Sequence, residues 1–264
     1  MKVEGRGFLK PALPCLSETV GHANQEQYRL LQEVVQFAEA LKDELVIKGQ
    51  ESAKEKQKVI AFVVFVRLLE IVEALIILAA YGVKEELKSL FRIFLDAYFI
   101  QANCCNDPDF IPVYFQTDEA ARLKLINVAE KYQTELFGLI NGYATKDIKE
   151  ELDRKIKQEK IDAFNSFQFA KNVGCEEIYD SIYRVLSSAV HTTPRCLDDY
   201  VDVDENGMIT AIRHGPDAET TDRITYDTTT FFLKSVSGLC ELFALDKESD
   251  LKRFADKLRT GCKK

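Results

Sequence analysis

Residues 59–80 read VIAFVVFVRLLEIVEALIILAA, the most apolar run of this chain. Arg67, Glu70 and Glu73 stand near its middle, and each such charge costs about 2.5–3.5 kcal/mol at the centre of a membrane-spanning helix. We therefore expect a central core helix over residues 52–81, hydrophobic on nearly all sides, and not a membrane span. Because Arg67 and Glu70 are three residues apart, they are expected to form a structural ion pair.

The composition around this helix indicates a large, helix-rich core. Of 264 residues, 46% are hydrophobic, which is enough apolar surface for a substantial interior. Only 12 Gly and 6 Pro interrupt the chain, and few breakers favour long helices. The formal net charge of −8 argues against a general nucleic-acid binder, so any RNA contact would need a local basic patch.

The cysteine and histidine patterns predict neither a disulfide framework nor a metal site. The seven cysteines are odd in number, and none forms a Cys-x-x-Cys pair, which is typical of reduced thiols in a cytosolic protein. Asp202-x-Asp204-x-Asn206-Gly207 begins like a calcium loop, but the twelfth position is Arg213 where a glutamate is required. No signal peptide is recognisable at the N-terminus. We expect a cytoplasmic protein without metal or other cofactor.

The remaining chain predicts an all-α fold of long antiparallel helices. Residues 1–22 are expected to form an irregular arm, and residues 23–264 a single helical domain. Asn206-Gly207, between alternating Val and Ile residues, predicts one small β-hairpin over residues 200–213. Further helices are expected over residues 24–47, 83–103, 111–140, 145–174, 226–245 and 247–258. The expected caps are Asn24, Thr145 and either Thr221 or Asp222, and the expected breaks include Gly49 and Asn141-Gly142.

A polar face is predicted on the helix that runs from about Glu176 to His191 and ends before Pro194. At about 100° per residue, one sector of roughly 60° carries four polar side chains. These are Asp180, Arg184, Ser187 and His191. The opposite side carries the apolar residues, which are expected to face the core: Ile178, Ile182, Val185, Leu186, Ala189 and Val190. The polar face is open to two interpretations, a solvated surface or a functional site.

Arg184 and His191, with six residues between them, resemble the Arg-x(4–6)-His motif of the HEPN superfamily. That resemblance implies an all-α helical bundle and a homodimer in which the Arg and His of two subunits form a composite ribonuclease site. It also implies cleavage without a metal, by attack of the RNA 2′-hydroxyl on the adjacent phosphate. Arg184 would clamp the phosphate, and His191 would act as general acid and base.

Two further blocks resemble an uncharacterised bacterial family, domain of unknown function number 5677. The first is LKSLFRIFLDAYFIQANCCNDPDF, residues 87–110, and the second is IYRVLSSAVHTTP, residues 182–194. The likeness implies a helical fold and supplies no activity. Arg92 and Asp96, four residues apart in the first block, are expected to pair against the helix of the second. They are candidates to contact substrate or support the site, together with Asp180, Tyr183 and Ser187.

Two functions remain open for this polar cluster. One is a HEPN-like, metal-independent endoribonuclease of a bacterial toxin or phage-defence system, acting on RNA as a homodimer. The other is a non-enzymatic binding or regulatory module in which the same cluster holds a nucleotide, another anionic ligand or a regulatory protein partner. A site requires Arg92, Asp96, Arg184 and His191 to converge in a cleft, whereas a structural role would bury them as closed pairs. No membrane partner is expected.

Overall fold

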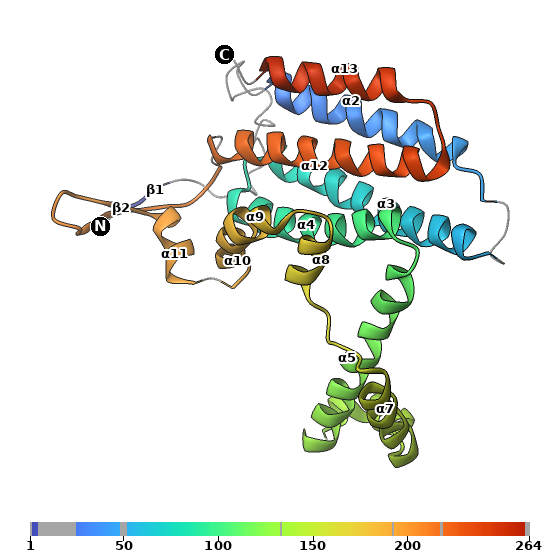
Figure 1. Ribbon diagram of the computed structural model, residues 1–264. Helices are drawn as coiled ribbons and strands as arrows, with labels where there is room; N and C mark the ends of the chain where they lie inside the picture. The colour runs from blue at the N-terminus through green and yellow to red at the C-terminus, as the bar shows by residue number, and fades with distance from the viewer. Residues whose placement is uncertain are drawn as a thin grey trace.

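The computed structural model describes residues 2–4, 25–47, 52–132, 134–191, 193–216 and 219–261. Two long helices, α3 (Ala53–Ala80) and α4 (Lys84–Asn106), run antiparallel through its centre. Three helices cover one side of this pair: α2 (Gln25–Leu41), α12 (Glu219–Phe243) and α13 (Glu248–Gly261), as Figure 1 shows. Shorter helices cover the other side. The fold is helical with one small sheet, which confirms the expected fold class.

The core lies where α3, α4 and α12 meet. Phe65 of α3 and Phe232 of α12 are fully buried, and their rings stack with centroids 5.9 Å apart. Phe94 of α4 is also fully buried in the same apolar cluster. Each such side chain contributes roughly 1.5–3 kcal/mol when it leaves water, so this junction holds the long helices together.

Helix α3 is less enclosed than its sequence predicts. Ser52 caps it by accepting a hydrogen bond from the Glu55 backbone, as expected for the helix start. Arg67 and Glu70 do pair, at 3.6 Å, but their side chains are 61% and 62% exposed, so the pair contributes little. They lie on a stripe of α3 that faces water, together with Val63 and Ile77. Within the described ranges, no helix has the length and apolar character needed to cross a membrane.

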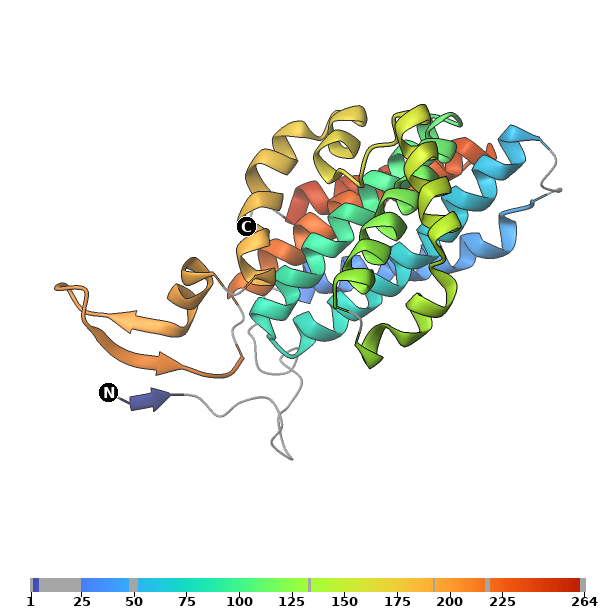
Figure 2. The ribbon, with the colours of Figure 1, turned by 90° about the horizontal axis from the view of Figure 1, so that it is seen from below.

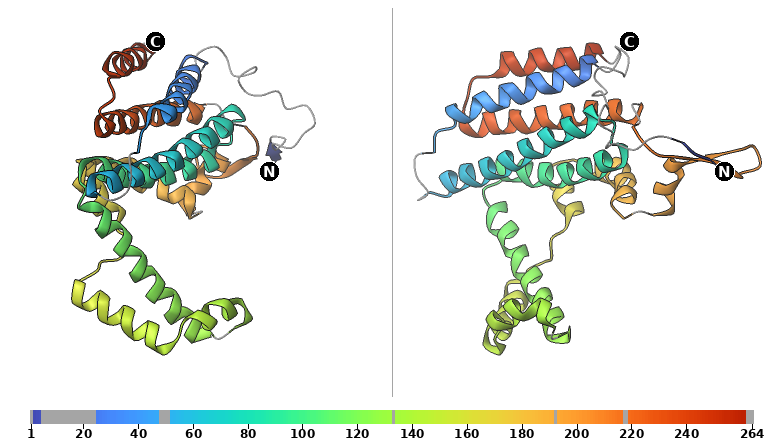
Figure 3. Two further views of the ribbon diagram at one scale, coloured as in Figure 1. Left: turned by 90° about the vertical axis from the view of Figure 1, so that its right-hand side faces the viewer. Right: turned by 180° about the vertical axis from the view of Figure 1, so that it is seen from behind.

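Two helices stand away from the bundle as an arm, seen most clearly in Figure 3. They are α5 (Phe110–Tyr132) and α7 (Lys146–Glu159), and the short α6 (Gly138–Tyr143) lies between them. The helix expected over residues 111–140 therefore ends early, at Tyr132, and Asn141-Gly142 lies inside α6.

The helix expected over residues 145–174 is two helices. α7 ends at Lys160, which takes a left-handed conformation, and α8 (Ser166–Asn172) begins after Asn165. The Asn165 side chain accepts a hydrogen bond from the Gln168 backbone, and this local bond starts a new helix rather than continuing the old one.

The C-terminal helices also differ in their bounds from the prediction. α12 begins at Glu219, so Thr221 and Asp222 lie inside it and do not cap it. It ends at Phe243, where Ala244 takes a positive φ of 55°, and α13 follows. At the same end of the bundle, α2 is followed by a short 3-10 turn over Lys42–Glu44, and Glu44 pairs with Lys247 between α12 and α13. The expected cap Asn24 and break Gly49 lie outside the described residues.

A three-stranded sheet projects from one end of the bundle, as Figure 2 shows. β2 (Val201–Val203) and β3 (Ile209–Arg213) form the expected antiparallel hairpin, with Gly207 at a φ of +76° in the turn. β1 (Lys2–Glu4) pairs parallel to β3, which gives the order β1-β3-β2. The first 22 residues were expected to be irregular, so this strand corrects that expectation. Backbone pairing with residues 209 positions away leaves little trace in a three-residue segment.

Candidate functional site

The helix with the predicted polar face contains a π turn. It consists of α9 (Glu176–Ile178), a π-helical segment η3 (Tyr179–Tyr183) and α10 (Arg184–Val190). A π turn holds more residues than an α turn, so helix faces assigned with a constant step of 100° per residue no longer apply on both sides of the turn. Tyr183 and Leu186 are buried, whereas Val185 is 56% exposed and Val190 is 38% exposed. The prediction that Val185 and Val190 face the core was wrong.

Asp96 is the centre of a hydrogen-bond network on the inner side of this helix. Its Oδ2 accepts from Arg92 Nη1 at 2.8 Å. Its Oδ1 accepts from Ser166 Oγ at 2.6 Å and from the Tyr183 hydroxyl at 3.0 Å. Burial raises the pKa of Tyr183 to about 12, so its hydroxyl stays protonated and can donate. The expected pairing of Arg92 and Asp96 against this helix is therefore present, with Ser166 of α8 as a partner that the sequence analysis missed.

Aromatic rings connect this network to the polar face. The Arg92 guanidinium packs over the Tyr183 ring at 4.7 Å, and that ring stacks on Tyr179 with centroids 4.4 Å apart. The Arg184 guanidinium lies 5.5 Å from the centroid of Tyr179 on the same helix. Cation–π contacts of this kind hold guanidinium planes in place without using all their donors. The stack fixes the helix on α4 and orients Arg184.

The polar face itself is open to solvent. Arg184 Nε pairs with Asp180 Oδ1 at 2.8 Å, with side chains 65% and 51% exposed. Ser187 is half-buried, and its hydroxyl donates to the Tyr183 carbonyl. His191 is exposed at the end of α10, and within the described part of the chain its imidazole has no hydrogen-bond or ion-pair partner. The chain therefore encloses Arg92, Asp96 and Tyr183 but leaves Arg184 and His191 outside that network.

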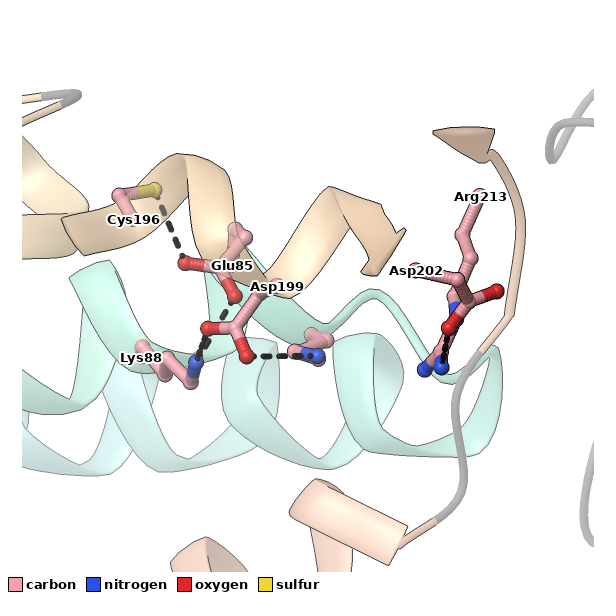
Figure 4. A network of polar contacts seen from close by, with 7 residues as sticks. Glu85, Lys88, Cys196, Asp199, Asp202 and Arg213 are labelled. Carbon is pink, nitrogen blue, oxygen red and sulfur yellow. Dashed lines mark hydrogen bonds and ion pairs between the residues drawn. The ribbon is translucent and has the colours of Figure 1, made fainter. Parts of the chain in front are cut away.

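A second polar network, which the sequence analysis did not predict, joins α4 to α11 (Pro194–Leu197) and the 3-10 turn after it (Figure 4). Asp199 lies between Lys88 and Lys84, with oxygens 2.5 and 3.1 Å from their Nζ atoms. Glu85 pairs with Lys88 at 2.8 Å and accepts from the Cys196 thiol at 3.2 Å.

The electrostatics of this network are those of a closed ion cluster. Burial would raise the pKa of Asp199, but hydrogen bonds from Lys88 and Lys84 outweigh it and lower that pKa. Burial and the Glu85 carboxylate raise the pKa of the Cys196 thiol to about 11, so the thiol stays neutral and donates. The only local signal was the spacing of Glu85 and Lys88, because their partners lie 111 residues further along the chain.

A groove of about 430 Å³ lies beside the helix 176–191, on a different side from its polar face. Ser181, Val185 and Ser188 line it, but Asp180, Arg184, Ser187 and His191 do not. Lys88, Arg195 and Arg223 bring three cations from three other elements to its walls. The three cations were not predicted as site residues from the sequence, since only the packing of distant elements brings them together.

The two hairpin carboxylates that begin a calcium-like loop in the sequence form an ion pair and hydrogen bonds within the hairpin. In the hairpin, Asp202 pairs with Arg213, and Asp204 Oδ1 accepts from the backbone of Asn206 and Met208 at 2.9 Å. These bonds shape the turn. Among the residues that the structure describes, no group of three or more His, Cys, Asp and Glu side chains is placed to hold a metal ion.

Comparison with protein-family models matches residues 57–209 to one family, described as a family of unknown function (DUF5677). The matched segment contains the Asp96 network, the polar face and the Lys88–Asp199 cluster. No curated protein and no solved structure matches the chain.

Proposed function

The chain belongs to the family of unknown function DUF5677, and we propose that the polar face of its helix 176–191 is half of a ribonuclease site completed by a second copy. In this proposal Arg184 of one copy grips the phosphate of an RNA strand, and His191 of the other copy moves a proton. The resemblance to the HEPN motif supplies the reaction: the 2′-hydroxyl attacks the adjacent phosphate, a 2′,3′-cyclic phosphate forms, and the 5′-oxygen leaves with a proton.

The observation that carries the proposal is the exposure of Arg184 and His191 on one helix whose inner side is fixed by the Asp96 network. An exposed Arg–Asp pair is worth at most about 1 kcal/mol, so a phosphate can take the place of Asp180. A guanidinium binds phosphate oxygens in bidentate fashion, and an imidazole titrates near neutral pH. The stacked Tyr179 and Tyr183 rings hold the helix in position for both groups.

The spacing of the two residues is the reason for a second copy. Arg184 and His191 are seven residues apart, which is roughly 10.5 Å along a helix axis. Two such helices related by a two-fold axis and running in opposite directions bring the Arg184 of each copy beside the His191 of the other. The interface is then isologous, with two equivalent composite sites.

Cleavage of mixed RNA in the presence of a chelator tests this reaction. The parent is expected to cleave, whereas His191→Ala and Arg184→Gln are expected to lose cleavage and keep the fold and the dimer. His214→Ala removes another exposed imidazole, in the region of the hairpin, and serves as the matched control. Intact RNA with the parent, or equal cleavage by parent and His191→Ala, contradicts the proposal.

Mixing the two inactive variants tests the composite site. A mixed dimer of Arg184→Gln and His191→Ala contains one site with both residues intact and one with neither. After random exchange of subunits, about a quarter of the parent's activity is expected to return. If both residues acted within one protomer, the mixture would stay inactive.

A second candidate is favoured by the closure of the Arg92–Asp96 network. Arg92 and Asp96 bond to one another, to Ser166 and to Tyr183, and in the described part of the chain no hydrogen bond or ion pair joins them to Asp180, Arg184 or His191. In that case the face holds an anionic ligand or a protein partner without chemistry. Binding of RNA that depends on Arg184, with no cleavage, distinguishes this module from the enzyme.

A further inference from the structure

The groove beside the π turn is formed by four elements from three separate parts of the sequence. α4 contributes Lys88, the helix 176–191 contributes Ile182 and Val185, α11 contributes Arg195, and the start of α12 contributes Arg223. Its volume of about 430 Å³ falls within the range of ligand pockets, roughly 300–1,000 Å³. The groove is therefore large enough for a small molecule with one ring system and a charged group.

Three cations and two carboxylates line the groove, and the cations differ in how fully they are engaged. Lys88 is held by Asp199 and Glu85. Arg223 pairs through Nε with Asp227 at 3.0 Å, is 75% exposed, and keeps its terminal nitrogens for another acceptor. Arg195 is exposed on α11 and has no partner among the described residues. Two guanidinium groups are thus available to bind an anion in bidentate fashion.

The rest of the lining is apolar except for two hydroxyls and two carboxylates, Asp199 and Asp227, which pair with Lys88 and Arg223. Ile182, Val185, Leu186 and Ile224 supply aliphatic surface, and Val185 is 56% exposed although its neighbours in the groove are apolar. Ser181 and Ser188 each donate their hydroxyl proton to a backbone carbonyl at 2.6 Å. Their oxygens keep the capacity to accept a hydrogen bond, for which sugar hydroxyls are suitable donors.

We propose that this groove binds a nucleotide, with its phosphate on Arg195 and Arg223 and its base and sugar against the aliphatic wall and the serines. An acyl anion has one charged end and no hydroxyls, so it would leave the serines and most of the cations without a partner. The proposal does not depend on the ribonuclease site, because none of the residues of the polar face lines the groove.

Calorimetric titration of the full chain tests this binding. The probes are the four nucleoside 5′-monophosphates, with adenosine, inorganic phosphate and decanoate as comparison compounds. At least one nucleotide is expected to saturate a single site. Adenosine and phosphate, which each lose one half of the contacts, are expected to bind at least about tenfold more weakly.

Two variants with matched controls locate the site. Arg195→Gln removes a charged donor and is expected to weaken nucleotide binding about ten- to a hundredfold. Val185→Glu places a carboxylate on the aliphatic wall and is expected to abolish binding. Arg259→Gln on α13 and Val63→Glu on α3 change exposed residues that do not line the groove and are expected to bind like the parent.

Three results would overturn the proposal. One is the absence of saturable binding by all four nucleotides at millimolar concentration. Another is binding of inorganic phosphate or decanoate as tight as that of the best nucleotide, because the groove would then be a simple anion or acyl site. The third is unchanged nucleotide binding in both Arg195→Gln and Val185→Glu, which would place the nucleotide elsewhere.

Discussion

At the scale of single residues, Asp96 connects three elements through one carboxylate. It accepts from Arg92 on its own helix, from Ser166 at the start of α8 and from Tyr183 in the π turn. Its side chain is only 18% exposed, so these bonds are poorly replaced by water. The same chain contains a second Arg–Asp pair four residues apart, Asp180–Arg184, on an exposed surface. The two pairs form a natural comparison between an enclosed and an exposed ion pair.

We predict that Asp96→Ala destabilises the protein by about 2–4 kcal/mol, because it leaves a half-enclosed guanidinium and two hydroxyls without their acceptor. Asp180→Ala is expected to cost no more than about 0.5 kcal/mol, the usual value for an exposed pair on one helix. Urea unfolding followed by circular dichroism measures both. Equal stability of the two variants would show that the Asp96 network contributes no more than a surface pair.

A pH-dependent effect is predicted at Asp199, whose pKa is lowered by Lys88 and Lys84 against the effect of burial. A carboxyl with a lowered pKa stabilises the fold above its unfolded pKa of about 3.9 and loses this contribution as the pH falls through the folded value. Asp199→Asn is therefore expected to cost about 1 kcal/mol at pH 7, allowing for solvent screening. The difference from the parent should shrink as the pH falls below about 3.9 and through the lower folded-state pKa.

Unfolding of parent and Asp199→Asn across the acid range checks this sign. Asp162→Asn, in an exposed segment between α7 and α8, is the control and should follow the parent at every pH. A parent–variant difference at Asp199 that stays constant from pH 7 to pH 2 would mean that the ion pairs with lysine do not contribute.

At the scale of elements, the π turn decides which surface each residue of the helix 176–191 occupies. The additional residue in the turn brings the Tyr179 and Tyr183 rings into a stack and directs Tyr183 onto Asp96. It also leaves Val185 on the groove rather than in the core. The polar face and the groove are thus two neighbouring surfaces of one helix.

Two glycines have equally open surroundings but differ in backbone conformation. A Cβ added at Gly207 or at Gly142 would meet nothing within 4 Å, but Gly207 has a φ of +76° whereas Gly142 lies in helix α6. Gly207→Ala is expected to cost about 1 kcal/mol through strain in the hairpin turn. Gly142→Ala is expected to stabilise by about 0.5–1 kcal/mol through lower entropy of the unfolded chain.

Hydrogen exchange of the hairpin amides, together with global unfolding, distinguishes these effects. Faster exchange in β2 and β3 is expected for Gly207→Ala only. Stabilisation by Gly207→Ala would contradict the left-handed conformation of the turn.

At the scale of the whole molecule, the bundle and the arm differ in how much apolar surface they bury. α3 and α4 are lined with buried side chains along their whole length. In the arm, by contrast, the described buried residues are Phe110, Ile126 and Ala129 of α5 and Leu152 of α7. α7 is stabilised largely by charge pairs, including Lys155–Glu119 at 2.5 Å and Lys149–Glu130. Such pairs contribute little when they are exposed.

We therefore predict that the arm opens before the bundle. In hydrogen exchange under native conditions, amides of α7 and of the second half of α5 should exchange markedly faster than those of α3, α4 and α12. Raising the salt concentration should widen the difference, because it screens the charge pairs of the arm. Protection in α7 equal to that in α4 would mean that the arm is stabilised by contacts beyond those in one chain.

The features that the sequence determined by itself are those set by neighbours within a few positions. The apolar run of residues 59–80 predicted the central helix, and Asn206-Gly207 predicted the hairpin. The spacing of Arg92 and Asp96 predicted their pair, and the two blocks at residues 87–110 and 182–194 indicated the family. Each of these depends on helical period or turn geometry, which a short segment contains in full.

Only the tertiary structure decided where those segments meet. The partners of Asp96, Ser166 and Tyr183, lie 70 and 87 residues further along the chain. The partner of Glu85, Cys196, lies 111 residues further along. The π turn changed the faces predicted for Val185 and Val190, and β1 joined a sheet through backbone bonds that place no demand on its side chains. The groove exists because α4, α11 and α12 pack around one helix. Long-range packing sets these positions, and a local pattern in the chain does not contain it.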